Sequence, residues 1–214
     1  LFRDNIIFNQ FGLGFSIYGS AAAFLKNFSL QGNIHFNDEF VVGGKGPAEN
    51  IELIENYVYK YGARLWFGKT LNKNLTLTRN FFPALTQIFW WDRIQATGNT
   101  FYRRDNAGAS LEIRLPDGGK PSDYFFDQNT FINGPSNPSQ MVMSEATTNY
   151  RETFTFATWR QKLGFDLNGQ NLVYPDRHPV EPHVFVRRNF FEPDRAHIVI
   201  YNWRHGESVD VDIS

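Results

Sequence analysis

Short apolar runs alternate with polar positions along the first hundred residues, and they lack the three-to-four-residue periodicity of an amphipathic helix. The runs are 4–6 residues long, and turns of glycine, asparagine or lysine separate them. Residues 74–80, for example, read Asn-Leu-Thr-Leu-Thr-Arg-Asn, with leucine at every second inner position. That alternation is expected of a strand with one buried face. The pattern therefore predicts strands and turns over residues 1–102.

This strand pattern repeats. Residues 50–56 read Asn-Ile-Glu-Leu-Ile-Glu-Asn, and related stretches stand at 27–33, 74–80 and, more weakly, 93–99. The second asparagine of the unit recurs at positions 5, 33, 56, 80 and 99, in steps of 28, 23, 24 and 19 residues. Short strands at this period favour a parallel coil, because hairpins need not preserve a column of identical residues. Equivalent asparagines on successive coils would lie about 4.8 Å apart and could hydrogen-bond to one another.

The stacked asparagines, the Gly-Asn signature before an aliphatic or aromatic residue, and coils of about 23–25 residues resemble a known class. They are similar to the right-handed parallel β-helix proteins of the pectate-lyase-like superfamily. The resemblance covers about residues 1–135 and implies an all-β fold. Because that superfamily includes lyases, hydrolases, epimerases, phage tailspikes and adhesins, the resemblance predicts the fold more narrowly than the activity.

The chain changes character after the repeats. Residues 110–115 alternate like a strand, and residues 123–132 echo the repeat once more. We expect residues 136–182 to be a loop-rich connector with a short helix over 153–163 that stops before Gly164. Residues 183–214 predict an antiparallel β segment, with strands over 183–188, 196–203 and 208–213. This segment resembles the start of the small β-sandwich that follows the β-helix in some bacterial carbohydrate-associated proteins. It either packs on the helix or continues in further chain.

Composition excludes some functions and leaves others open. The formal net charge of −1 and pI near 6.6 give no basic footprint for nucleic acid. The chain has no cysteine and no apolar run long enough to span a membrane. Aromatic residues make up 17%, led by 22 phenylalanines, which suits a core of stacked rings or a face for sugar or protein. The chain begins in mid-pattern, so we expect a missing amino terminus, and the lack of a signal peptide does not bear on location.

A column of turn residues carries the most suggestive chemistry. Aligning the segments between the asparagine units places Lys45 beside Lys69, about 5 Å apart, with Ser20 and Asp92 in the same column. Like charges that close disfavour each other's ionisation, so one lysine could act as a neutral base while the other binds a carboxylate. Arg64 lies nearby. β-Helix lyases on uronic-acid polymers resemble this arrangement, since they abstract a sugar C5 proton with a lysine or arginine. Alternatively, both lysines extend into solvent.

Aromatic and charged residues flank this column. The predicted substrate contacts are Trp66, Trp90, Trp91, Asp92 and Arg93, with Phe67 and Phe89 among the same rings. Outward-facing rings would stack on sugar faces. Internal stacking, or cover by the C-terminal segment, is the alternative.

Other chemistries find less support in the residues. Glycoside hydrolysis needs two carboxylates at a fixed separation, and the repeats contain no repeated acidic pair. Asp38 and Glu39 are the candidates for a Ca²⁺ ion, although such sites take several carboxylates. No other metal or cofactor is expected, and the histidines show no metal-binding spacing.

Two functional hypotheses follow. The first is a secreted, periplasmic or cell-surface β-helix that acts on a polysaccharide, in particular an anionic one; in its lyase version Lys45, Lys69 and Arg64 are the catalytic residues. The second is a non-catalytic carbohydrate-binding, adhesive or structural β-helix. A trimeric tailspike fragment is a third class. The residues leave enzyme and binder open, together with the identity of the polysaccharide and the oligomeric state.

Overall fold

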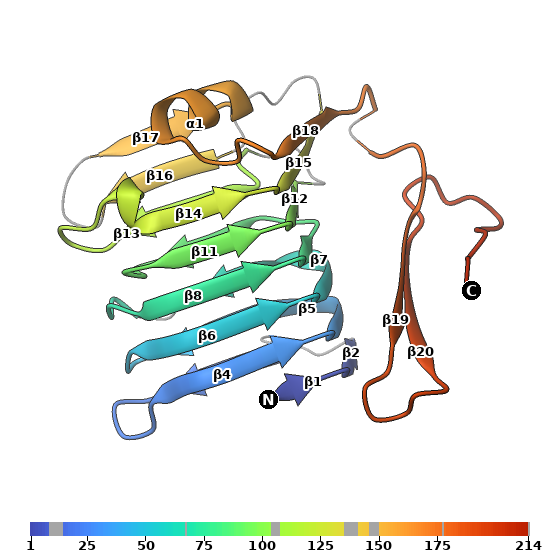
Figure 1. Ribbon diagram of the computed structural model, residues 1–214, viewed down its shortest axis with the longest axis horizontal. Helices are drawn as coiled ribbons and strands as arrows, with labels where there is room; N and C mark the ends of the chain where they lie inside the picture. The colour runs from blue at the N-terminus through green and yellow to red at the C-terminus, as the bar shows by residue number, and fades with distance from the viewer. Residues whose placement is uncertain are drawn as a thin grey trace.

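A computed structural model describes residues 1–8, 15–66, 68–103, 108–134, 141–145, 150–176 and 178–213, with the backbone alone at Asp38. The protein is mostly β-strand, and its chain passes repeatedly through the same two sheets, so that successive passes stack on one another (Figure 1). We call each pass a coil. The predicted all-β fold with parallel sheets is confirmed.

The first sheet is six-stranded and wholly parallel. Its strands, in spatial order, are β1 (Phe2–Arg3), β4 (Leu25–Gln31), β6 (Ala48–Ile54), β8 (Lys73–Thr78), β11 (Ile94–Thr97) and β14 (Tyr124–Asp127). Register places the inward side chains in columns, as where Leu30 pairs with Leu53 and Leu53 with Leu77. These leucines are fully buried, which explains the strict alternation in the sequence.

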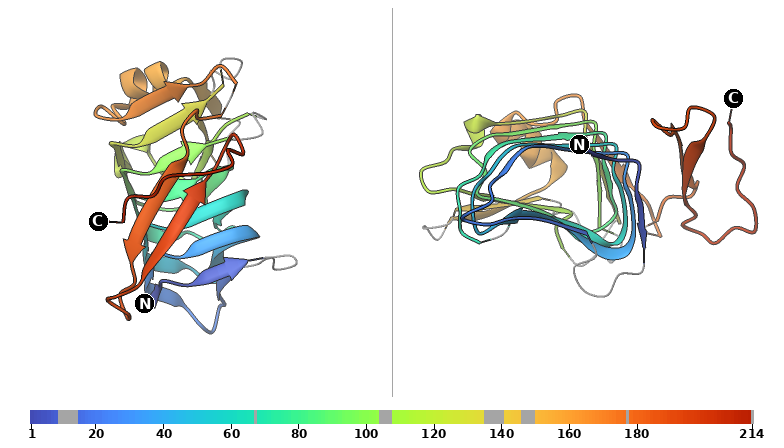
Figure 2. Two further views of the ribbon diagram at one scale, coloured as in Figure 1. Left: turned by 90° about the vertical axis from the view of Figure 1, so that its right-hand side faces the viewer. Right: turned by 90° about the horizontal axis from the view of Figure 1, so that it is seen from below.

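The second sheet curves around the other side of each coil (Figure 2). One arm contains β2 (Ile6–Phe8), β9 (Phe81–Phe82), β12 (Thr100–Tyr102), β15 (Thr130–Asn133) and β18 (Gln170–Val173). The other arm contains β3 (Phe15–Gly19), β10 (Thr86–Phe89), β13 (Leu111–Leu115), β16 (Met141–Glu145) and the antiparallel β17 (Arg151–Phe154). The long strands β5 (Ile34–Gly44) and β7 (Tyr57–Leu65) run through both arms. Parallel pairing continues past residue 135 through β16 and β18.

A buried asparagine ladder joins the two sheets at one corner of every coil. Its members are Asn5, Asn33, Asn56, Asn80, Asn99 and Asn129. Each side-chain amide donates to the Oδ1 of the next asparagine over 2.9–3.0 Å, and that same Oδ1 accepts from the backbone N–H. The residue before each of these asparagines has a left-handed backbone, which turns the chain into the next sheet. The predicted ladder is present.

A second, exposed ladder runs along the other end of the six-stranded sheet. Asn74 donates to Asn50, and Asn50 donates to Asn27, each over 2.8 Å. All three have φ of 54–55°, the left-handed region that asparagine tolerates. The backbone N–H of Asn74 donates to Asp92 Oδ1 at 3.0 Å, so the aspartate continues the column on the next coil.

Between the sheets lies one continuous apolar core of stacked side chains. Phe82, Phe101 and Phe131 form a column with ring centroids 6.0 and 5.4 Å apart. Helix α1 (Phe156–Leu163) covers the end of this core (Figure 1). Thr155 caps its first turn, and Gly164, at φ 69°, ends it as predicted. A short 3₁₀ turn, η1 (Pro121–Asp123), precedes β14.

The C-terminal segment is a two-stranded antiparallel hairpin of β19 (His183–Arg188) and β20 (Ala196–Tyr201), which stands beside the coils (Figure 2). It packs on them through a second apolar cluster around Tyr57, Phe81 and Tyr201. The prediction of a third strand over 208–213 is wrong. Val209 and Val211 are half-buried there, but no described strand pairs with the segment, and a lone alternating run lacks the ladder bonds that define a strand.

Arg187 fastens the hairpin to the turn corner of the first coils. It forms ion pairs with Asp4 and Glu55. Both residues have a left-handed backbone at this corner, Asp4 on the coil before Gly32 and Glu55 on the coil after it. The Arg187 side chain occupies the space that a Cβ at Gly32 would need. Tyr201 adds a hydrogen bond from its hydroxyl to the carbonyl of Val58, 2.9 Å away.

Candidate functional site

The outer face of β7, β10 and β13 gathers polar and aromatic side chains from three neighbouring coils. Leu65, Ile88 and Ile113 pair in register and point into the core, where they are fully buried. Because strand side chains alternate, the residues on either side of these three point outward. They form two outward rows, the first of Arg64, Gln87 and Glu112 and the second of Trp66, Phe89 and Arg114.

Aromatic rings and guanidinium groups stack on one another in the second row. The Trp66 and Phe89 rings stack with centroids 4.9 Å apart and planes 24° apart, and Trp90 meets Trp66 edge-on at 5.3 Å. The Arg114 guanidinium lies 4.5 Å from the Phe89 centroid, and the Arg64 guanidinium lies 5.5 Å from the Trp66 centroid. We call Arg64, Trp66, Phe89, Trp90 and Arg114 the outer aromatic surface.

Carboxylates border this surface. Glu39 Oε1 lies 2.6 Å from Arg64, and Glu112 accepts from Gln87 at 2.9 Å while lying 3.8 Å from Arg114. The Arg64 and Arg114 side chains are 35% and 34% exposed, so these ion pairs are screened by water and contribute little stability. A competing anion can therefore exchange with Glu39 or Glu112 at small cost.

Three N–H donors within the surface have no acceptor among the described residues. They are Trp66 Nε1, Trp90 Nε1 and Arg64 Nε, and each atom is covered from solvent. A buried donor without a partner costs about 1–3 kcal/mol. All three groups donate and none accepts, so the cluster is complementary to a ligand that presents oxygen acceptors.

The backbone register between β5 and β7 differs by one residue from the register that the predicted lysine column requires. Val41 pairs with Arg64, a step of 23 residues, whereas Lys45 above Lys69 requires 24. The backbone of Gly68 consequently lies beside Lys45, and Thr70 Oγ1 donates to the Lys45 carbonyl at 3.0 Å. Both lysines are exposed in the turns that follow β5 and β7, close to the outer aromatic surface in the chain.

The remaining predicted residues occupy three different places. Trp91 is fully buried in the core, where its indole donates to the Leu65 carbonyl at 2.8 Å. Asp92 continues the exposed asparagine ladder. Arg93 is exposed and lines a shallow polar hollow of about 370 Å³ on the six-stranded sheet with Asn50, Asn74 and Glu52. Phe67 lies outside the described residues. Arg64, Trp66 and Trp90 are thus the predicted residues that the fold brings together.

Sequence reasoning missed Arg114 and Glu112. The sequence shows their strand as an alternating run. However, the strand follows a stretch where the repeat is irregular, so its alignment with the preceding coils could not be read from the sequence. The only signal was the alternation itself, which puts Glu112 and Arg114 on the polar face of residues 110–115.

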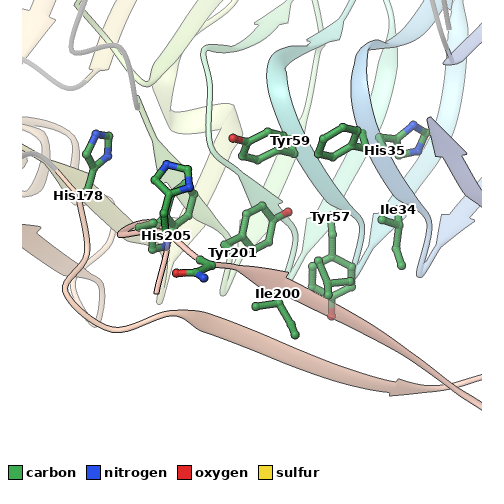
Figure 3. Close-up of a pocket in the computed structure, with 12 residues that line it drawn as sticks. Ile34, His35, Tyr57, Tyr59, His178, Ile200, Tyr201 and His205 are labelled. Atoms are coloured by element: carbon green, nitrogen blue, oxygen red, sulfur yellow. The ribbon is translucent and has the colours of Figure 1, made fainter. Parts of the chain in front are cut away.

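A cavity of about 580 Å³ lies on the other arm of the curved sheet, between the C-terminal hairpin and the coils (Figure 3). It is lined mainly by aromatic side chains and contains none of the predicted site residues. Its chemistry differs from that of the outer aromatic surface, and we treat it separately below.

The described residues contain no group of three or more His, Cys, Asp or Glu side chains placed to bind a metal ion. Of the two Ca²⁺ candidates, Glu39 pairs with Arg64, and the side chain of Asp38 lies outside the described part. Within the same part of the chain, no helix has the length and apolar character needed to cross a membrane.

Comparison with known proteins returned nothing: no family model, curated protein or solved structure matches this chain.

Proposed function

We propose that this protein is a right-handed parallel β-helix that binds an acidic polysaccharide on the outer aromatic surface. The parallel crossovers support the handedness, because such connections are right-handed in nearly all proteins. The asparagine ladder supports the resemblance to pectate-lyase-like proteins. We place the protein outside the cytoplasm, in the periplasm, at the cell surface or secreted, because acidic polysaccharides are found there.

The observation that carries the proposal is the convergence of three unpartnered N–H donors around Trp66. A uronic-acid unit offers what these groups lack. Its carboxylate and hydroxyl oxygens accept from the indole and guanidinium N–H groups, and the apolar face of its ring stacks on an indole. Because these donors are covered, binding in this way requires the half-buried Trp66 side chain to turn outward. Arg114 supplies a second cation two coils away from Arg64, across β10.

The proposal is tested by calorimetric titration with pectate and alginate, with a neutral glucan as the comparison polymer. Trp66→Phe keeps a ring and removes one N–H donor, and Arg64→Gln removes the guanidinium. We expect each to weaken binding about 10-fold or more, as for the loss of a hydrogen bond to a charged group. Arg195→Gln is the matched control, because Arg195 is 76% exposed in a hairpin ion pair away from the surface.

Binding of pectate and alginate that is unchanged in both surface variants contradicts the proposal, whether or not the neutral glucan binds elsewhere on the protein. So does a wild-type protein that binds neither acidic polymer at low ionic strength, where attraction between charges is strongest.

A lyase acting at the same surface is the second candidate. The observation that favours it is the position of Lys69, which follows Trp66 by three residues in an exposed turn, next to Gly68, whose backbone lies beside Lys45. Incubation with pectate, alginate and glycosaminoglycans would then yield unsaturated sugar ends, and Lys45→Ala or Lys69→Ala would remove that activity. Binding without any such product supports the non-catalytic alternative.

A further inference from the structure

The cavity between the hairpin and the coils has a floor of parallel aromatic rings. Phe36 on β5 and Tyr59 on β7 pair in register on adjacent coils. Their ring centroids are 5.1 Å apart and their planes differ by only 6°. Phe36 is 47% exposed, so part of this stacked pair is accessible to a ligand. We call the pair the Phe36–Tyr59 platform.

The opposite wall belongs to β20 and the turn after it. Tyr201 and Trp203 stack with centroids 5.3 Å apart and planes 14° apart. The wall is fastened at two points, by the Tyr201 hydroxyl on the Val58 carbonyl and by Trp203 Nε1, which donates to His183 Nδ1 at 2.8 Å. The cavity is therefore shaped by rings that are fixed in place on both sides.

Polar groups gather at one end of the cavity. Figure 3 shows His178 and His205 there, away from the Tyr59 ring, and the His205 backbone N–H donates to the Asn202 carbonyl at 3.4 Å. His178 Nδ1 is hydrogen-bonded to the Tyr102 hydroxyl, which fixes the imidazole orientation. Among the described residues that line the cavity, none is Asp, Glu, Lys or Arg. A charged ligand would lose its hydration without meeting an opposite charge, which is costly.

We propose that this cavity binds an uncharged sugar unit, at a site separate from the outer aromatic surface. A hydroxylated ring has the two features that the cavity matches, namely a flat C–H face for the Phe36–Tyr59 platform and hydroxyls for the imidazole end. The volume of about 580 Å³ lies in the range of small-ligand sites. Since the residues come from β5, β7 and β20, a bound sugar also bridges the hairpin to the coils.

The test is a titration of the full chain with neutral oligosaccharides, namely cellohexaose, mannohexaose and maltohexaose, monitored by calorimetry and by tryptophan fluorescence. Binding of at least one is expected, and Phe36→Ala should weaken it about 10-fold, because it removes half of the platform. Tyr61→Ala is the matched control. Tyr61 is a ring on β7, the strand of Tyr59, with 48% exposure close to that of Phe36, and it is not among the residues that line the cavity. Bound sugar should also slow amide exchange in β20.

Three results would overturn this inference: no saturable binding of any of the three sugars, equal binding by Phe36→Ala and wild type, or binding of a planar aromatic dye alone. The outcome is independent of the acidic-polysaccharide proposal. Trp66→Phe should leave neutral-sugar binding unchanged, and Phe36→Ala should leave pectate binding unchanged.

Discussion

Asn129 donates its side-chain amide to the carboxylate of Asp166, 2.7 Å away, where the buried asparagine ladder ends beneath helix α1. The bonds between successive ladder asparagines all run in the same direction, so the last member must accept without donating onward. Trp159 donates to the other carboxylate oxygen at 2.9 Å. Burial raises the pKa of the Asp166 carboxyl, while these donated bonds act to lower it. An ionised carboxylate, which only accepts, suits this position.

Asp166→Asn should lower the free energy of unfolding by about 1–3 kcal/mol at neutral pH. The oxygen of the new amide can still accept from Asn129, but its NH₂ group then faces the Trp159 N–H, so that two donors meet. Urea denaturation provides the measurement. Asp127→Asn is the control, because Asp127 accepts two bonds from Asn168 on the exposed surface. Equal losses in the two variants would argue against a special role for the ladder terminus.

The two asparagine ladders should differ sharply in their contribution to stability. Asn80 is buried and makes four hydrogen bonds through its side chain, so Asn80→Ala should cost about 3 kcal/mol or more. Asn50 makes exposed bonds at φ 54°, and Asn50→Gly keeps that conformation available, so its cost should stay below about 1 kcal/mol. Chemical denaturation of both variants checks the difference. A larger loss of unfolding free energy for Asn50→Gly than for Asn80→Ala would contradict the greater contribution that we assign to the buried ladder.

Gly32→Ala should release the hairpin from the coils. The new methyl overlaps Arg187 Nε and Asp4 Oδ1, and φ of +64° adds strain of about 1–2 kcal/mol. Gly98→Ala separates these effects, since Gly98 occupies an equivalent ladder turn at φ +67° and its Cβ would meet only Arg79 Cγ at 3.3 Å. Hydrogen exchange across β19 and β20 should rise in Gly32→Ala alone. Matched exchange in the two variants would show that Arg187 does not fasten the hairpin.

Acid should weaken the hairpin through His183. Burial lowers the pKa of this imidazole from 6.5, so the folded protein favours the neutral ring, whose Nδ1 accepts from Trp203. The stability it contributes is present above about pH 6.5 and is lost as the pH falls through the lowered folded value. Protection factors of the hairpin amides, which correct for the slower intrinsic exchange at lower pH, should therefore fall in wild type from pH 7.5 down to about 5. His183→Phe should flatten that dependence, and an unchanged profile would assign it to another group.

The sequence was most informative where one residue type must recur. Asn33, Asn56 and Asn80 are irreplaceable hydrogen-bonding partners, so their spacing predicted the parallel coils and the ladder. The helix end at Gly164 was equally readable, because a left-handed cap favours glycine.

Register between neighbouring coils was harder to read. Matching Gly-Lys at 44–45 to Gly-Lys at 68–69 gave a step of 24, whereas backbone pairing between β5 and β7 follows 23, with irregularities around Asp38. A slip of one residue reverses which face a strand side chain occupies. The step of 23 from Trp66 to Phe89 was read correctly, and their rings stack. The hairpin cavity depends on contacts between residues more than a hundred positions apart, which no local pattern encodes.

The left-handed turn residues before the buried asparagines have a broader consequence. Asp4, Gly32, Glu55, Arg79, Gly98 and Gln128 share one backbone shape, yet they differ in charge and size. Because the adjoining asparagines supply the hydrogen bonds, the corner does not depend on the chemistry of these side chains. Apart from Gly32, whose space Arg187 fills, each coil thus offers one variable position at the corner along an edge of the molecule. Asp4 and Glu55 already anchor Arg187. The side chains at the other corners form a row, and their charge and size can change without any change in the fold.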